Sequence, residues 1–569
     1  MKNTRITIVL FLLLIVVFLS LICRCIFLQF FKSGHYQSVC TKQQQRRDLK
    51  RPQRGVILDC RGRVLAASNK IQTIFAEPRI INRPKDTSTG LAPIVDMGAH
   101  EICKLITESK NPGFVKIKAG AEPNQCDAAV RIYGIGVQSD WQRYYPTGSL
   151  AAGVVGFTST DNRGLGGIEL EYEKELGGSC GQNIFLADAF RRPIRLHQEQ
   201  SEKSDVLEDG AGIILTIDAA IQQFALTELM KQYKSYQAES AVAIVAEPKT
   251  AAILAMVSLP HFDPTDIQSA DVNNFRNRAI SDQFEPGSIL KPIVAAIAID
   301  EGVVGLDEKI FCENGSYHGK GFGQIGEYSN HAFGELTVRE ILVKSSNIGM
   351  AKIGQKLGKD RLHKGLERFG FGRKTGIDLP GEVEGLLWPV DKWTGYSVTR
   401  IPFGQEISVT AIQLIRAFCI LANSGHSVCP FVVWAMVENT GGVTKLKQPP
   451  PPVGFIVKPE VARCIIEDAL VGVVNEGTGQ KAKLEKWQLF GKTGTANIAK
   501  SEKRGYSEDD YIASFIAGAP VDDPKVVVLV SIRKPNKHLG KGYTGGAVAA
   551  PVAARIIEKT LNYLEKHQQ

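Results

Sequence analysis

This chain of 569 residues lacks the cysteine spacings that mark a metal or redox site. Its 11 cysteines are an odd number, are scattered along the sequence, and form no C-x-x-C pair. The spacing therefore supports neither a zinc site, nor a redox motif, nor a disulfide framework, and leaves only single bridges open. No zinc-finger or RNA-binding motif accompanies the net charge of +9, so we expect no nucleic-acid partner.

A single stretch supplies the long hydrophobic run. Ile6 to Cys23 is almost entirely apolar and is long enough for a membrane-spanning helix. Phe27 to Phe31 extends the run past Arg24, whose side chain can snorkel to the interface. No Ala-x-Ala cleavage site follows, which favours an uncleaved anchor over a signal peptide.

The charges around this run set up a conflict over orientation. Lys2 and Arg5 precede it, and a larger basic group follows it: Arg24, Lys32, Lys42, Arg46 and Arg47. The positive-inside rule alone would place the C-terminal bulk in the cytoplasm. The basic residues that continue this group are interpreted as a solvated or lipid-near face: Lys50, Arg51 and Arg54.

The length is too great for one hydrophobic core, so we expect two or three domains, without internal repeats. The region from Ser33 to about Asp205 is expected to be an extended, mixed domain. Arg54–Asp59 and Gly62–Ala66 alternate like two strands around a turn. No catalytic constellation appears in this region, which predicts a spacer with a docking role.

The pattern of the residues after about Asp205 predicts an α+β domain. Leu215–Asp218 leads into a helix that reaches about Lys234, and Ala241–Ala246 and Ala251–Ser258 form a hairpin. Helical patterns dominate from Ser288 to about Gly425, and three strands then return: Leu489–Ala496, Ile512–Ala519 and Lys525–Arg533. This order implies one mixed sheet with its helices segregated. Pro449–Pro452 is expected to be an exposed loop, and Thr560–Gln569 a polar helical tail.

The most informative stretch is Phe284-Glu-Pro-Gly-Ser-Ile-Leu-Lys-Pro292. If Ser288 opens a helix, its side chain and that of Lys291 share one face of the first turn. A serine hydroxyl is a poor nucleophile until a base takes its proton. A buried lysine can be that base, because burial disfavours its charged form.

Two later motifs turn this weak signal into a strong one. Lys344-Ser-Ser-Asn347 and Gly491-Lys-Thr-Gly-Thr495 follow Ser288 in the order S-x-x-K, S-x-N, K-T-G. The surrounding text, including "FEPGSILKP", "VKSSNIGMAKIG" and "FGKTGTA", resembles the monofunctional class B penicillin-binding proteins, in their septal, FtsI-type branch. The resemblance covers nearly the whole chain. The chain departs from the usual pattern at Cys60, where arginine is common, and at Glu247 and Ala251.

The resemblance implies four parts: residues 1–5 as a short cytoplasmic N-terminus, 6–31 as the transmembrane anchor, 32–205 as the pedestal or dimerisation domain, and 206–569 as the penicillin-binding transpeptidase domain. It implies a β-lactamase/transpeptidase-like fold and a location outside the cytoplasmic membrane, on the periplasmic side, against the charge rule. We follow the resemblance, because a transpeptidase must reach its substrate.

The resemblance also assigns roles. Ser288 is the nucleophile and Lys291 its base. Ser345 relays a proton, Asn347 holds the substrate amide, and Lys492 attracts a substrate carboxylate. The remaining three residues bind substrate: Thr493 bonds that carboxylate, Gly494 admits the substrate backbone, and the Thr495 N–H completes the oxyanion site with that of Ser288.

The expected reaction is crosslinking of peptidoglycan stem peptides through an acyl-enzyme, in septal wall synthesis, with β-lactams as inhibitors and with neither metal nor organic cofactor. The expected partners are membrane lipid, a SEDS-type glycosyltransferase and other division proteins. A D,D-carboxypeptidase or β-lactamase and a catalytically idle division scaffold are the alternatives. The candidate histidine bases His261, His331 and His426 are interpreted as structural, because none stands at a recognisable spacing from an acid and a nucleophile.

Overall fold

The computed structural model describes residues 2–186, 207–437, 443–446, 454–500 and 505–567. The chain forms two compact units, Met1–Gln53 with Gly178–Asp209, and Arg54–Gly177 with Gly210–Gln569. The expected loop Pro449–Pro452 and the last two residues of the expected C-terminal tail lie outside the described residues.

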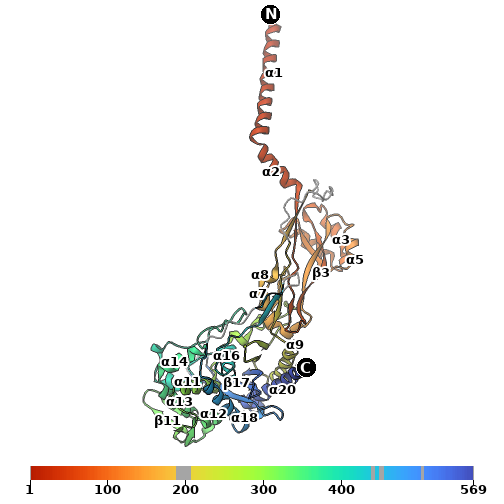
Figure 1. Ribbon diagram of the computed structural model, residues 1–569. Helices are drawn as coiled ribbons and strands as arrows, with labels where there is room; N and C mark the ends of the chain where they lie inside the picture. Colours follow the sequence, from red (N-terminus) through yellow and green to blue (C-terminus); the bar gives the residue numbers. More distant parts are fainter. Residues whose placement is uncertain (1, 187–206, 438–442, 447–453, 501–504, 568–569) are drawn as a thin grey trace. The chain divides into compact units, whose positions relative to one another are not determined.

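The first unit begins with the apolar helix (Figure 1). Helix α1 (Lys2–Ile26) continues as a π-helical turn (Phe27–Phe31), and α2 (Ser33–Gln44) follows. Within Ile6–Phe31, an 18-residue window has a mean hydropathy of 3.3 and no buried residue, which is consistent with a single-pass membrane anchor. Beyond it, β1 (Gln45–Lys50) pairs antiparallel with β6 (Gly181–Leu186). The side chains of the basic group in β1 are outside the described part of the chain. For Arg54, which lies beyond β1, the prediction of a solvated or lipid-near face was wrong, because this residue is 2% exposed.

The second unit contains a seven-stranded sheet in which β2 (Ile57–Leu58) and β3 (Val64–Ala76) join across a turn. This confirms the two strands expected on either side of Cys60, and Gly62 supplies the positive φ of 77° that the turn requires. The other strands are β4 (Val115–Ala119), β5 (Ile135–Tyr144), β7 (Gly212–Leu215), β14 (Val433–Val437) and β15 (Val443–Leu446). β2 runs parallel to β7, and the other pairs are antiparallel.

Three helices cover part of this sheet and close a small core: α3 (Pro84–Val95), α4 (Ala99–Thr107) and α5 (Pro123–Ala129). Three shorter helices follow: α6 (Ala152–Val155), α7 (Gly167–Glu171) and α8 (Glu173–Gly177). A buried ion cluster ties these segments together, because Glu169 accepts from Arg54 Nε at 2.5 Å and from Arg143 Nε at 2.6 Å. Removing one charged side chain from such a cluster leaves an uncompensated buried charge.

The second sheet has the order β16-β17-β18-β8-β9 and is antiparallel throughout. Its strands are β16 (Phe490–Ala499), β17 (Tyr506–Ala519), β18 (Val526–Arg533), β8 (Ser240–Ala246) and β9 (Ile253–Leu259). The expected strands and the β8–β9 hairpin are confirmed. The expectation of a mixed sheet was wrong, because every strand pair in this sheet is antiparallel. The order of strands along the sequence does not fix their direction.

Helices cover both faces of this sheet, where the sequence order had suggested that they would be segregated. α9 (Ala219–Ser235) and α20 (Ala550–His567) pack side by side on one face (Figure 1). α11 (Lys291–Asp300) and α16 (Ala411–Ala422) belong to the core on the other face. Alternate residues of the central strands enter the two cores, with Ile244 and Leu529 on one side and Ala243 and Val528 on the other. The α+β class is confirmed.

The region between Ser288 and Gly425 is mainly helical, as predicted, but short strands interrupt it. Its larger helices include α12 (Val338–Lys344), α13 (Asn347–Leu357) and α14 (Lys359–Arg368). Four short strands interrupt the expected helical region: β10 (Lys309–Phe311), β11 (Ser316–Gly319), β12 (Gly323–Gly326) and β13 (Glu335–Thr337). Strands of three or four residues are too short to show an alternating pattern, so the sequence did not reveal them.

Gly404 fixes the turn before α11. It has φ of 86°, and a Cβ there would lie 2.0 Å from the carbonyl oxygen of Gly287. We predict that Gly404→Ala lowers the melting temperature of the full chain, by a free-energy loss of about 1–3 kcal/mol for backbone strain and more for the clash. Gly302→Ala is the matched control, because Gly302 has φ of 68° with open space around it. Equal losses in the two variants would show that the contact with Gly287 is unimportant.

Candidate active site

Ser288 lies on a 3₁₀ turn (Gly287–Leu290) that runs directly into α11. Its side chain is partly exposed, whereas the flanking residues Gly287 and Ile289 are buried. Lys291 is the first residue of α11 and is 0% exposed. Pro292 occupies a position at the helix start, where a missing N–H costs no intrahelical bond. The spacing predicted from the sequence therefore puts one accessible hydroxyl and one buried amine on the same turn.

The amine of Lys291 reaches the second motif. Its Nζ donates to Ser345 O at 2.6 Å, to Asn347 Oδ1 at 2.8 Å and to Ser345 Oγ at 3.2 Å. Ser345 caps the C-terminal end of α12 in the left-handed conformation, with φ of 62°. Asn347 opens α13 two residues later. The short link between α12 and α13 thus delivers three acceptors to one buried amine.

The third motif completes the cluster from the sheet. Lys492 lies on β16 and is 0% exposed. Its Nζ donates to Ser345 Oγ at 3.0 Å and to Thr493 O at 3.3 Å. The hydroxyl of Ser345 therefore lies between two buried lysine amines.

Burial controls the protonation of both amines. Desolvation lowers the pKa of Lys291 to about 7, although the negative charge of Glu327 acts in the opposite direction. Burial also lowers the pKa of Lys492 well below its usual range, and the charge of Lys291 lowers it further. At neutral pH a substantial fraction of Lys291 is consequently an unprotonated amine, which can accept a proton.

The other residues of the K-T-G motif hold the strand in place. Thr493 Oγ1 lies 2.6 Å from Thr478 Oγ1, and Thr495 Oγ1 accepts from the Gly545 N–H at 3.0 Å. A Cβ on Gly494 would lie 2.9 Å from Ile289 Cγ1 and 3.1 Å from Pro286 O. The close approach that this glycine permits is therefore with the turn that carries Ser288. The structure brings all eight sequence-predicted site residues onto these three adjoining segments.

Glu327 is a site residue that the sequence analysis missed. It is 8% exposed, and its carboxylate accepts from Ser346 Oγ at 2.5 Å, from Asn347 N at 2.7 Å and from Ile348 N at 3.2 Å. A carboxylate is favoured at a helix N-terminus, where it satisfies unpaired N–H groups. Glu327 thus fixes the start of α13, on which Asn347 lies. No motif flagged it, because it sits in an irregular segment.

A pair of tyrosines joins the two sides of the site. Tyr328 follows Glu327, and its hydroxyl lies 3.2 Å from that of Tyr543. Tyr543 lies just before α19 (Gly545–Val548), whose first residue bonds Thr495. The Tyr543 ring packs at a tilt against Tyr511, with the ring centroids 4.5 Å apart. The sequence analysis did not find this contact, because nothing in the local pattern links positions so far apart.

The arrangement contains the parts that acyl transfer requires. It offers the hydroxyl of Ser288 and the amine of Lys291, whose pKa is lowered. It also offers the Ser345 hydroxyl between the Lys291 and Lys492 amines, and the Asn347 amide, which binds Lys291. Among the alternatives for the base, the His426 ring packs at a tilt against Phe455 and its Nδ1 lies 3.0 Å from Asn423 O, and the His331 ring packs at a tilt against Phe333. These contacts agree with a structural interpretation of both histidines.

Comparison with known proteins gives two family matches. Residues 241–558 match the penicillin binding protein transpeptidase domain, and residues 49–206 match the penicillin-binding protein dimerisation domain. The chain is 34% identical over 553 residues to stage V sporulation protein D of Bacillus subtilis, covering 96% of this chain and 84% of that protein. It is 29% identical to peptidoglycan D,D-transpeptidase FtsI of Escherichia coli, covering 89% and 82%.

A solved structure shows the same fold. Penicillin-binding protein 3 of Mycobacterium tuberculosis, complexed with aztreonam, matches with a TM-score of 0.71 and 26% identity. The match covers 91% of this chain and 97% of that chain.

We predict that Glu327→Gln shifts the pH dependence of acylation by labelled penicillin. Removing a negative charge near Lys291 lowers the pKa of that amine further, so the midpoint of the acylation rate moves to lower pH. Stability also falls, by about 1–3 kcal/mol, because three donors lose their carboxylate. Glu335→Gln, at an exposed position of β13, is the control. A midpoint that stays in place would contradict the influence of Glu327 on Lys291.

Proposed function

We propose that this chain, which belongs to the penicillin-binding protein transpeptidases, crosslinks peptidoglycan stem peptides through an acyl-enzyme on Ser288. Peptidoglycan D,D-transpeptidation is the activity of this family, and the family match spans the three motifs. The observation that carries the residue assignment is the position of Ser345 Oγ between the amines of Lys291 and Lys492.

The first half-reaction forms an ester. Ser288 Oγ attacks the carbonyl carbon between the two terminal D-Ala residues while neutral Lys291 accepts its proton. Backbone N–H groups of Ser288 and Thr495 stabilise the oxyanion. Collapse of this intermediate breaks the peptide bond. Ser345 passes a proton to the departing D-Ala nitrogen and is reprotonated by Lys492, which until then holds the terminal carboxylate of the donor peptide together with Thr493.

The second half-reaction reverses these roles. The amine of a neighbouring stem peptide attacks the ester carbonyl and loses a proton through the same relay. Ser288 recovers its proton as leaving group, and the new amide bond is the crosslink. Under this proposal β-lactams acylate the same serine; similar solved structures of penicillin-binding protein 3 are complexed with aztreonam and with ampicillin.

The rest of the chain gives this reaction its setting. Residues 6–31 anchor the protein, 32–205 form the pedestal, and 206–569 carry the chemistry outside the membrane. The likeness to FtsI supports a septal role in division. A crosslinking enzyme also needs glycan strands, and the proposed supplier is a multi-spanning SEDS-type polymerase.

Lys291→Arg should acylate slower by roughly 10²–10⁴, because arginine keeps the charge but cannot act as the base. In the wild type the acylation rate should rise with pH through about 7 and then level off, since the base is the unprotonated form of Lys291. Stopped-flow acylation with a fluorescent penicillin measures both, with Ser288→Ala as the unlabelled control. If the Lys291→Arg variant were acylated at a near wild-type rate, another residue would have to be the base.

The orientation of the chain is tested with two reporters fused after Gln569. A reporter enzyme that is active only outside the cytoplasm should be active, despite the basic residues that follow the anchor. A cytoplasm-only reporter at the same site should be silent. The reverse result would mean that the charge rule, rather than the functional assignment, describes this protein.

Replacing Ile6–Phe31 with an unrelated anchor should weaken co-purification with the polymerase while penicillin still labels Ser288. Helix contacts in lipid depend on packing and polar groups, and Ser20 and Arg24 lie four apart on one face of α1. Unchanged co-purification after the swap would limit the helix to anchoring and leave the pedestal as the contact.

A further inference from the structure

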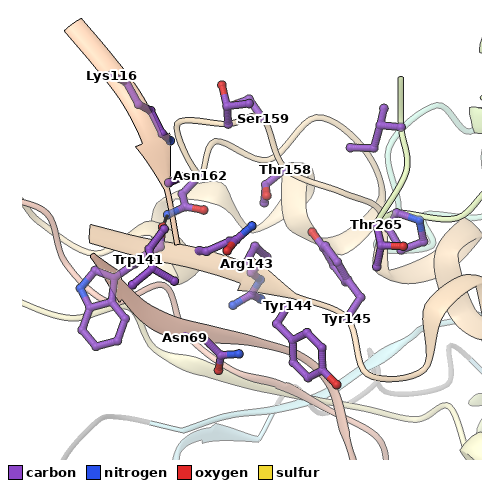
Figure 2. A pocket seen from close by; sticks show the side chains of 16 residues that line it. Asn69, Lys116, Trp141, Arg143, Tyr144, Tyr145, Thr158, Ser159, Asn162 and Thr265 are labelled. Carbon is purple, nitrogen blue, oxygen red and sulfur yellow. Dashed lines mark hydrogen bonds between the residues drawn. The ribbon is translucent and has the colours of Figure 1, made fainter. Parts of the chain in front are cut away.

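Two places in the second unit bring a cation next to hydroxyl groups. One is a groove beside β3 and β5, where Arg143 belongs to the lining (Figure 2). The guanidinium of Arg143 is already paired there, because its Nε donates to the buried carboxylate of Glu169 at 2.6 Å. The other place is β16, the strand of the K-T-G motif. The Lys492 amine contacts Ser345 Oγ and Thr493 O but no carboxylate in the described part of the chain, so an anion is better placed here.

Thr478 lies outside the three motifs but contacts the K-T-G strand. It follows the short helix α18 (Val471–Asn475), and its Oγ1 lies 2.6 Å from Thr493 Oγ1. Among the described residues, no other group bonds to the Thr493 hydroxyl. Thr493 is 7% exposed, so water can offer its hydroxyl few other partners. What the Thr493 hydroxyl can do for a substrate therefore depends on Thr478.

A single proton lies between these two hydroxyl oxygens. A threonine hydroxyl has one proton to donate and can accept through its oxygen, whereas a carboxylate can only accept. If Thr493 donates to Thr478, it has no proton left for a substrate. If Thr478 is the donor instead, the proton of Thr493 stays free. The proposed role of Thr493 in binding the donor carboxylate is therefore possible in one of the two arrangements, the one in which Thr478 donates.

We propose that Thr478 is a positioning residue for recognition of the terminal carboxylate of the donor peptide, a role that rests on the proposed function. The Thr478 hydroxyl donates to Thr493 Oγ1, and the Thr493 hydroxyl donates to the carboxylate, so both O–H groups point toward the anion. A hydrogen bond to a charged acceptor is stronger than one between neutral groups, and hydrogen bonds in such a chain strengthen one another. The pair therefore contributes to selectivity for a peptide that ends in a carboxylate.

The backbone around Thr478 is held from two sides. The Gly479 N–H donates to Val473 O at 2.9 Å, which ties this segment to α18. A Cβ on Gly546 would lie 2.5 Å from Thr478 O, so α19 approaches the same segment closely. A β-branched side chain such as that of threonine also has few χ1 rotamers. The hydroxyl is thus in place before a substrate binds, and binding costs little conformational entropy.

Two thioesters separate carboxylate recognition from the rest of the reaction. N-benzoyl-D-alanyl-thioglycolate ends in a carboxylate, and its carboxamide differs only in its neutral terminal group. Both present the same carbonyl to Ser288 and release a thiolate, which needs no proton. The full chain in detergent micelles is assayed with each compound by the loss of thioester absorbance. The ratio of the two kcat/KM values measures selectivity for the carboxylate, and the wild type should prefer the carboxylate.

Thr478→Val should lower this ratio by roughly three- to tenfold, through slower reaction with the carboxylate compound. Thr478 is exposed, so valine keeps the shape of the side chain without disturbing the core. Thr478→Ser restores the donor and should keep the ratio within about twofold of wild type. The matched control is Thr227→Val on α9, where the threonine hydroxyl accepts from Gln223 Nε2 at 2.9 Å, and it should change neither rate. Melting temperatures confirm that each variant is folded.

Combining Thr478→Val with Thr493→Val shows whether Thr478 acts through Thr493. If it does, the double variant has the same ratio as Thr493→Val alone. A further fall in the double variant would mean that Thr478 binds the substrate itself, and it would overturn the proposal. An unchanged ratio in Thr478→Val, or equal losses with both thioesters, would overturn it as well. Turnover by Ser288→Ala would refute the proposed function and this role together, whereas the other outcomes leave the proposed function standing.

Discussion

The burial of two lysine amines around one hydroxyl is the constraint on which the active site depends. A charged amine without water is costly, so Lys291 and Lys492 need the acceptors that surround them. Those acceptors come from the α12–α13 link and from β16, and neither segment is close to α11 in sequence. The packing of both layers must therefore be correct before the chemistry can exist.

One residue in a strained conformation lies where these layers meet. Ser345 adopts a left-handed conformation that a serine seldom occupies, and the capping box of Thr337 and Glu340 secures the other end of the same short helix. The carboxylate of Glu327 then ties the N–H groups that open α13. The strained serine is held from both sides, which explains how its hydroxyl stays between the two amines.

The sequence was sufficient to find the groups proposed to carry the chemistry, which the structure brings together, and insufficient for those that position them. Ser288, Lys291 and Lys492 stand in motifs whose order is rarely accidental, and the anchor and the β8–β9 hairpin have strong local patterns. Glu327, Thr478 and the pair Tyr328–Tyr543 act only through contacts across the fold, which leave no periodicity to detect. Strand direction in the central sheet is likewise a tertiary property.

The coupling between the two lysines suggests why the site contains both. A positive charge on Lys291 lowers the pKa of Lys492. Under the proposed mechanism, Lys291 becomes charged when it accepts the proton of Ser288, and at that moment Lys492 holds its own proton less tightly. Ser345 Oγ is within hydrogen-bonding distance of both amines and can carry that proton toward the leaving nitrogen. Proton uptake at one amine thereby favours proton release from the other, so the Ser345 hydroxyl links the base of the first step to the acid of the next.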